Sequence, residues 1–126
     1  YKHPKMKGLI SLTHGEGFGL PLLEAAACGL PVCATNWSAH TEFLNLGLWT
    51  KVRGRVEPIP DAKLDGNTFV QGAQWANPDI PMARKTIEAF VKEEKPDTDG
   101  LQKQVRKHYS FEAISRKYDS FWKRWK

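Results

Sequence analysis

The stretch between residues 8 and 36 constrains the fold most, because strand and helix signals alternate within it. Residues 8–13 (GLISLT) are aliphatic and β-branched, which is typical of a buried strand. A glycine-rich turn (HGEGFG) follows. Residues 21–28 then begin with proline and end just before Gly29, as a short helix does. Residues 31–36 (PVCATN) are another apolar run, typical of a parallel strand that is covered on both faces. This order predicts a βαβ unit.

Downstream of this unit, the sequence predicts a short helix, a strand and a long connection. Ser38 is placed to cap a helix that runs toward Gly47, and residues 48–54 (LWTKVRG) have the composition of a third strand. Residues 57–75 contain scattered prolines and glycines without a regular period, so we expect an irregular connection there. The expected fold class is α/β, with a Rossmann-like three-layer parallel sheet.

The segment from residue 79 to 126 has the period of helices. Residues 95–97 (KPD) end the first of them, Asp99 is placed to cap the second, and Ser110 the third. The apolar stripe of the last helix has the spacing of side chains that pack on a core. That stripe consists of Phe111, Ile114, Tyr118, Phe121, Trp122 and Trp125. We therefore expect residues 1–126 to form one domain that ends in helices.

The glycine-rich turn is the segment best suited to ligand binding. Gly15, Gly17 and Gly19 fall within five positions directly after the first strand. Glycine allows a ligand to approach the backbone closely, and the N–H groups at the start of the next helix favour phosphate. Such turns lie at the carboxyl edge of open parallel sheets, where ligands bind. The turn lacks both the GxGxxG fingerprint and the Lys-Ser/Thr pair of a P-loop, which argues against an ATP-hydrolysing site.

Two glutamates, Glu16 and Glu24, flank the turn at a spacing of E-x7-E. Glu24 is the only charged residue between Gly17 and Asn36, and an ionised carboxylate in so apolar a run must reach solvent, a donor or a ligand. Three interpretations are open. Glu24 could be favoured by the helix dipole, the two could be a glycosidase carboxylate pair, or they could accept hydrogen bonds from sugar hydroxyls. The last fits a phosphate-binding turn best.

Charge and composition narrow the class of protein. The chain has 126 residues, 40% hydrophobic and 26% charged, which excludes disordered, collagen-like and coiled-coil chains. Its net charge of +5 comes from residues 101–126, which carry eight basic and two acidic side chains. There the basic residues interleave with the apolar stripe, a pattern that nucleic-acid-binding segments can have. An apolar stripe at helical spacing is more often part of a core, and a run of charges is more often a solvated face, so nucleic acid is a weak candidate partner. Peripheral contact with an acidic membrane surface is also open.

The cysteines and the N-terminal residues bear on the cellular setting. Cys28 and Cys33 are too few for a disulfide framework, and no further ligands accompany them for zinc. They fit a reducing compartment. We find no secretory leader and no apolar run of about 20 residues, as a bilayer span requires. We therefore expect a cytoplasmic protein. The first residue, Tyr1, indicates a fragment or a processed product.

Several segments resemble the retaining GT-B glycosyltransferases of the family-four group. EGFGLPLLEAAACGLPVCAT is similar to the donor-binding motif of that family, with Glu16 and Glu24 as its E-x7-E pair. NWSAHTEFL resembles the family's next turn, with Glu42 in the acidic position, and WANPD and HYSFEAISRKYDSFW resemble its final helices. The resemblance implies that the chain is the C-terminal part of a GT-B donor domain. The implied reaction transfers a sugar from a nucleotide sugar with retention at the anomeric carbon.

The resemblance also implies roles for individual residues. Glu16, the implied catalytic residue, would contact the hydroxyls of the donor sugar, and Glu24 would accept hydrogen bonds from the ribose. Backbone N–H groups would meet the sugar and the diphosphate at Gly17, Phe18, Gly19 and Leu20. His14 and Glu42 are further candidates, with a strand-end and a turn-stabilising role as the respective alternatives. No metal and no cofactor are implied, since the nucleotide sugar is a substrate.

Two parts of the family pattern have no match in this chain. Lys2, Lys5 and Lys7 do not correspond to the Arg/Lys pair that grips the pyrophosphate. No acceptor domain precedes the donor motif, so a sugar, lipid or protein acceptor would bind to a part of the enzyme outside this chain. We expect the chain alone to be inactive. The alternative function is a non-catalytic nucleotide-sugar-binding module.

Overall fold

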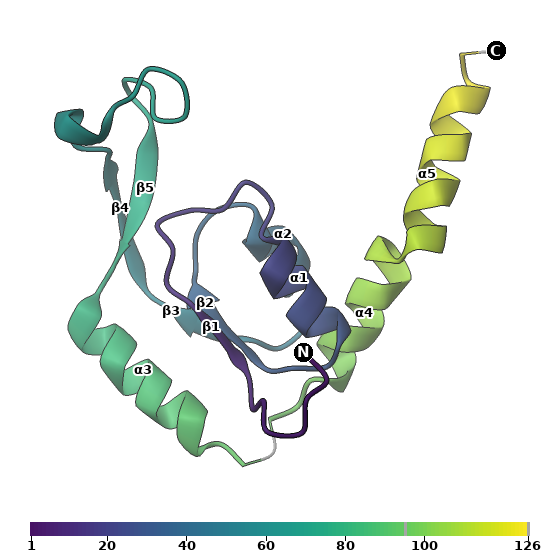
Figure 1. Ribbon diagram of the computed structural model, residues 1–126, viewed down its shortest axis with the longest axis horizontal. Coiled ribbons are helices and arrows are strands. Elements are labelled where there is room, and N and C mark those ends of the chain that lie inside the picture. The colour runs from purple at the N-terminus through teal and green to yellow at the C-terminus, as the bar shows by residue number, and fades with distance from the viewer. Residues whose placement is uncertain (95, 126) are drawn as a thin grey trace.

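A computed structural model describes residues 1–94 and 96–125, and a small parallel sheet lies at its centre (Figure 1). Its strands are β1 (Leu9–Ser11), β2 (Val32–Thr35) and β3 (Thr50–Val52), in that spatial order. The predicted α/β fold class and βαβ unit are confirmed, and each strand is shorter than its predicted run. Lys95, expected where a helix ends, and Lys126, counted among the C-terminal basic residues, lie outside the described residues.

Helices cover both faces of this sheet. Val32 and Ala34 of β2 belong to the core cluster on one face, and Cys33 to the cluster on the other. The first face is covered by α1 (Leu20–Ala27), α2 (His40–Leu44) and α4 (Asp99–Tyr109), and the second by α3 (Ile80–Lys92) (Figure 1). Burial raises the pKa of the Cys33 thiol to about 11, so this cysteine is a protonated core residue at neutral pH.

The helix that follows the glycine-rich turn, α1, is fixed at both ends. Its N-cap, Gly19, has a φ of 84°, and a Cβ there would lie 2.9 Å from a side-chain carbon of α2. Pro21 lies in the first turn, as predicted. At the other end, Arg106 Nε and Gln102 Nε2 of α4 donate to the carbonyl oxygen of Ala27, at 2.7 and 3.3 Å. The positive charge of Arg106 at the C-terminal end of α1 also interacts favourably with the helix dipole.

The irregular connection predicted over residues 57–75 is confirmed for residues 59–73, but its two ends are paired strands, which the sequence did not predict. β4 (Gly54–Pro58) and β5 (Gln74–Pro78) form an antiparallel ribbon, and a 3-10 turn, η1 (Asp61–Lys63), lies in its loop. Prolines do not break this ribbon because they stand at strand ends. The predicted strand 48–54 is accordingly divided between β3 and the start of β4. The ribbon rises from the body of the molecule, away from α1 and α4 (Figure 1).

The predicted helix caps had mixed outcomes. Ser38 does not cap α2, which has no side-chain cap; its hydroxyl bonds to the glycine-rich turn instead, and its φ is 82°. Asp99 is not a cap either, because Thr98 holds that position and Asp99 is the first helical residue. Ser110 caps the last helix as predicted, and its Oγ accepts a hydrogen bond from the Ala113 N–H at 3.2 Å.

The last helix, α5 (Phe111–Lys123), projects from the body of the molecule (Figure 1). The expectation that its apolar stripe packs on the core was wrong: Phe111, Trp122 and Trp125 are 83%, 61% and 75% exposed. Ala113 is the buried residue of this helix, and it lies on a different side from the stripe, so contact with the body turns the stripe outward. Within the described ranges, no helix is long and apolar enough to cross a bilayer.

Candidate functional site

A cleft of about 570 Å³ lies where the glycine-rich turn meets the β4–β5 ribbon. The turn follows β1, at the carboxyl edge of the parallel sheet, where open α/β sheets bind their ligands. One side of the cleft comes from segments 13–17 and 37–38. The ribbon contributes Ile59, Thr68, Phe69, Ala73, Gln74 and Trp75. The volume is in the range of small-molecule sites.

Ser38 fixes the main chain of the turn at Glu16. Its Oγ donates to the Glu16 carbonyl oxygen at 2.7 Å and accepts from the Glu16 N–H at 3.0 Å. These bonds hold Ser38 in a left-handed conformation that is costly for a residue with a side chain. Glu16 lines the cleft and is half-buried, and its carboxylate makes no hydrogen bond or ion pair with any described residue. It is therefore free to accept hydrogen bonds from a ligand.

Four consecutive backbone N–H groups, which lead from the turn into the first residue of α1, are also free. Among the residues that the structure describes, none accepts a hydrogen bond from the N–H of Gly17, Phe18, Gly19 or Leu20. The helix has no side-chain cap and no acidic residue in its first turn. An uncapped helix N-terminus carries partial positive charge and favours phosphate or another anion. The turn thus offers N–H donors next to the Glu16 carboxylate.

His14 is tied to β5. Its carbonyl oxygen accepts from the Ala76 N–H at 2.9 Å, and its Nδ1 lies 3.0 Å from the Ala76 carbonyl oxygen. Because a carbonyl only accepts, we assign the proton to Nδ1, which leaves Nε2 as an acceptor in the neutral ring. The imidazole also stacks on the Trp75 indole, with ring centroids 4.2 Å apart and an interplanar angle of 17°. These contacts fix the orientation of His14, which lines the cleft.

The structure groups some of the predicted site residues and separates the others. His14, Glu16 and Gly17 line one cleft. The predicted residues outside its lining are Phe18, Gly19, Leu20, Glu24 and Glu42. The Glu24 side chain is exposed on α1 and has no hydrogen-bond partner among the described residues. Its carboxylate therefore reaches solvent, which is one of the outcomes that its apolar sequence context left open.

Phe18 and Glu42 lie near the α2–α4 contact. The Phe18 ring meets the rings of Phe43 and Tyr109, with centroids 5.5 and 6.0 Å apart. Burial, and then the negative charge of Glu42, raise the pKa of Tyr109. Glu42 is exposed, and its carboxylate forms no hydrogen bond in the described part of the chain, so this side chain does not hold its own turn together by such a bond.

The aromatic side of the cleft was not predicted from the sequence. Phe69 and Trp75 meet edge to face, with centroids 6.2 Å apart. Asp65 holds the loop, since its Oδ1 accepts from the N–H groups of Phe69, Asn67 and Thr68 at 2.8 to 2.9 Å. These bonds, that from Phe69 foremost, lower the pKa of Asp65. Asp65-Gly66 marks this local turn, which lies inside the loop between β4 and β5 and does not indicate which strands pair.

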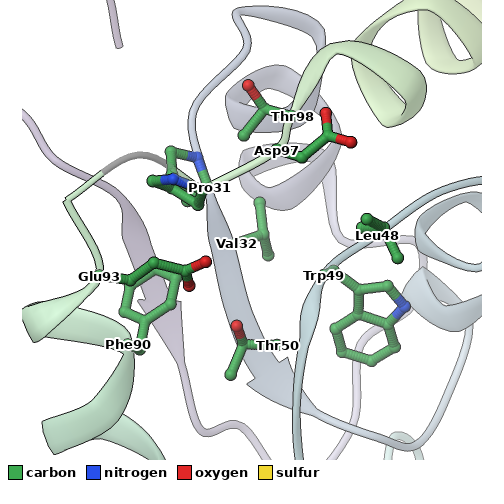
Figure 2. A pocket seen from close by; sticks show the side chains of 10 residues that line it. Pro31, Val32, Leu48, Trp49, Thr50, Phe90, Glu93, Asp97 and Thr98 are labelled. Carbon is green, nitrogen blue, oxygen red and sulfur yellow. The ribbon is translucent and has the colours of Figure 1, made fainter.

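A smaller cavity of about 240 Å³ lies near the amino ends of β2 and β3 (Figure 2). Its lining includes Trp49 and Phe90 and two carboxylates, Glu93 and Asp97, with no cationic side chain among the described lining residues. Carboxylates disfavour a phosphate, and this is not the edge where parallel sheets bind ligands. We therefore place the candidate site at the larger cleft.

Comparisons of the chain with protein-family models, with curated protein sequences and with solved structures gave no match. The class of protein therefore rests on the α/β fold and on the geometry of the cleft. Within residues 1–94 and 96–125, no group of three or more His, Cys, Asp or Glu side chains is arranged to hold a metal ion.

Proposed function

We propose that this chain is the nucleotide-sugar-binding part of a retaining glycosyltransferase with a Rossmann-like GT-B donor domain. One observation carries the proposal: Glu16, whose half-buried carboxylate has no partner among the described residues, is followed directly by four backbone N–H groups, those of residues 17–20, that also have none. A diphosphate needs such donors, and a sugar needs a hydroxyl acceptor within one ring's length of them. The sequence resemblance supports the same assignment of the turn.

In the proposed reaction, the bond between the anomeric carbon and the diphosphate oxygen breaks. A bond from that carbon to an acceptor oxygen forms on the same face. The leaving nucleoside diphosphate takes the electron pair, and its departing oxygen accepts the proton that the acceptor hydroxyl loses. The N–H groups of residues 17–20 stabilise the charge that develops on the diphosphate. Glu16 holds the sugar hydroxyls and so positions the anomeric carbon.

Glu24 is the proposed acceptor for the ribose hydroxyls. Its exposed carboxylate has no partner among the described residues, and it stands one turn into the helix whose start binds the phosphates. His14 is proposed to contact the sugar through Nε2. The acceptor substrate is proposed to bind to another part of the enzyme. The rival function, a nucleotide-sugar-binding module without transfer, uses the same contacts.

Calorimetric titration tests this function. We expect the wild-type chain to bind UDP-glucose or GDP-mannose, and Glu16→Gln and Glu24→Gln to weaken that binding about 10- to 100-fold, as loss of a charged hydrogen bond does. Glu88→Gln, on the exposed part of α3, is the control. Unchanged affinity in both variants would contradict the proposed roles. Hydrolysis of the bound donor, measured alongside, separates a transferase from a binding module.

The placement of α5 favours one partner besides the substrate, an acidic membrane surface. Its outward stripe of aromatic rings is bordered on the helix by Lys117 and Arg124, and such helices lie in the bilayer interface. We expect sedimentation with phosphatidylserine vesicles at low salt and release at high salt. Trp122→Ala should reduce that binding, whereas Trp49→Ala should not. Absence of binding at low salt would exclude this partner and favour a protein surface.

A further inference from the structure

The β4–β5 ribbon builds an aromatic wall on one side of the cleft. Phe69 and Trp75 form an edge-to-face pair there, and Trp37 lines the cleft from the segment after β2. Phe69 keeps 38% of its surface exposed, and Trp37 is half-buried. Both therefore leave ring surface open to the cleft. Aromatic faces carry negative charge density and suit a ligand face made of C–H groups.

The wall is held in place before any ligand binds. Asp65 accepts a hydrogen bond from the backbone N–H of Phe69, and His14 stacks on Trp75 while it bonds to Ala76. These contacts join the ribbon loop to the end of β1. Fixed side chains lose little conformational entropy on binding, so such a wall can select among similar ligands.

The cleft also has polar lining residues, from both the turn and the ribbon. The Glu16 carboxylate and the His14 Nε2 supply unpaired acceptors, and Thr13, Thr68 and Gln74 also line the space. The indole N–H of Trp75 is buried and has no hydrogen-bond partner among the described residues. Buried donors of this kind are rare in folded proteins, because their desolvation is costly. A ligand that presents an apolar face and a rim of hydroxyl groups matches this combination.

We propose that the ribbon side of the cleft is a pyranose-binding subsite, in which a C–H face of the sugar lies on Phe69 while its hydroxyls meet Glu16 and His14. This inference deepens the proposed function, on which it rests for the neighbouring diphosphate. It makes the β4–β5 ribbon the element that selects the sugar. The pyranose is either the sugar of the nucleotide sugar or a saccharide acceptor, since both present the same chemistry.

Titrations of the full chain test the subsite. The probes are UDP, UDP-glucose, GDP-mannose and the methyl glycosides of glucose and mannose. We expect Phe69→Ala to weaken binding of the sugar-containing probe about tenfold, as loss of one aromatic contact does, and to leave UDP affinity unchanged. Phe69→Tyr keeps the ring and should keep the affinity. Phe121→Ala, the same truncation on α5, should change nothing.

The source of the sugar is read from backbone amide shifts. Shifts of residues 68–75 with methyl glycosides alone indicate a saccharide site, whereas shifts with nucleotide sugars alone indicate the transferred sugar. Equal weakening of UDP and nucleotide sugars in Phe69→Ala would overturn the subsite in favour of base stacking. The subsite would also be overturned if the chain bound none of the sugar-containing probes. Methyl glycoside binding without any nucleotide binding would overturn the proposed function and retain the subsite. Phe69→Leu replaces Phe69→Ala if the latter unfolds.

Discussion

Two groups of aromatic side chains in this molecule are held in opposite ways. Trp75 and Phe69 in the cleft are fixed by a stacked imidazole, by a carboxylate that binds the loop backbone, and by the pairing of two strands. At the end of α5, the Phe121 ring meets those of Trp122 and Trp125, with centroids 5.4 and 6.0 Å away, and the three residues are 50% to 75% exposed. Similar residue types thus form a rigid wall in one place and an open stripe in the other.

The difference shows how the same chemistry serves two kinds of binding. Rings whose position is set by tertiary contacts can discriminate among small ligands, because a misfit ligand cannot push them aside without breaking those contacts. Rings presented by a helix alone can adapt to a deformable or extended surface. Residue type therefore says less about function here than the contacts that restrain each ring.

The largest expected effect tests how rigidly the cleft side is fixed. Gly19→Ala should lower the free energy of unfolding by about 3 kcal/mol, because its positive φ and the close α2 side chain both oppose a methyl group. Gly17→Ala, whose added methyl group would have no atom within 4 Å, should leave stability unchanged and still hinder an anion at the N–H groups. Urea denaturation and phosphate titration check both. Equal stability of the two variants would contradict a fixed turn.

A matched pair of tryptophans compares the two aromatic groups directly. Trp75→Ala should cost about 2 kcal/mol, less than a fully buried ring would, because the indole is half-buried and supports His14. Trp122→Ala should stay within about 0.5 kcal/mol, as exposed substitutions do. Chemical denaturation measures both. A cost for Trp122 as large as that for Trp75 would mean that the α5 stripe is packed in solution.

The smallest effect concerns pH and is confined to the ribbon loop. The pKa of Asp65 is lowered below its ordinary value of 3.8 by the N–H bonds of Phe69 and its neighbours. The ionised carboxylate therefore stabilises the loop above about pH 4, and this support is lost as the pH falls through the lowered folded-state pKa. Amide shifts of residues 67–69 should move in that acid range, while those of α5 residues 113–117 should not follow the same titration.

Substitution separates charge from geometry in this loop. Asp65→Asn keeps an oxygen acceptor and should remove the acid transition while it preserves much of the loop. Asp65→Ala should release the loop at every pH. An acid transition that persists in Asp65→Asn would assign the titration to another group.

The sequence predicted the parts of the fold that local signals control. The strand, glycine turn, proline-initiated helix and strand of residues 8–36 are present, because propensity, capping and apolar pattern agree there. The ribbon was missed because its pairing joins residues up to 24 positions apart, Gly54 with Pro78, and its strands are half-exposed. The grouping of His14 and Glu16 with Phe69 and Trp75 depends on that pairing, so local patterns do not contain it. Ser38 was assigned wrongly for a related reason, since its partner is 22 residues away.

The hydrogen bonds from Arg106 and Gln102 to Ala27 span 79 and 75 positions of the chain, and they set the smallest piece that can keep the cleft intact. A polypeptide shortened to remove α5 would retain them. A polypeptide that ends before α4 would leave the end of α1 unanchored. It would also lack Leu101 and Val105, and would expose the part of the core that these two side chains cover. The C-terminal helices therefore differ in kind: α4 is an inseparable part of the unit that holds the turn, and α5 is dispensable to it.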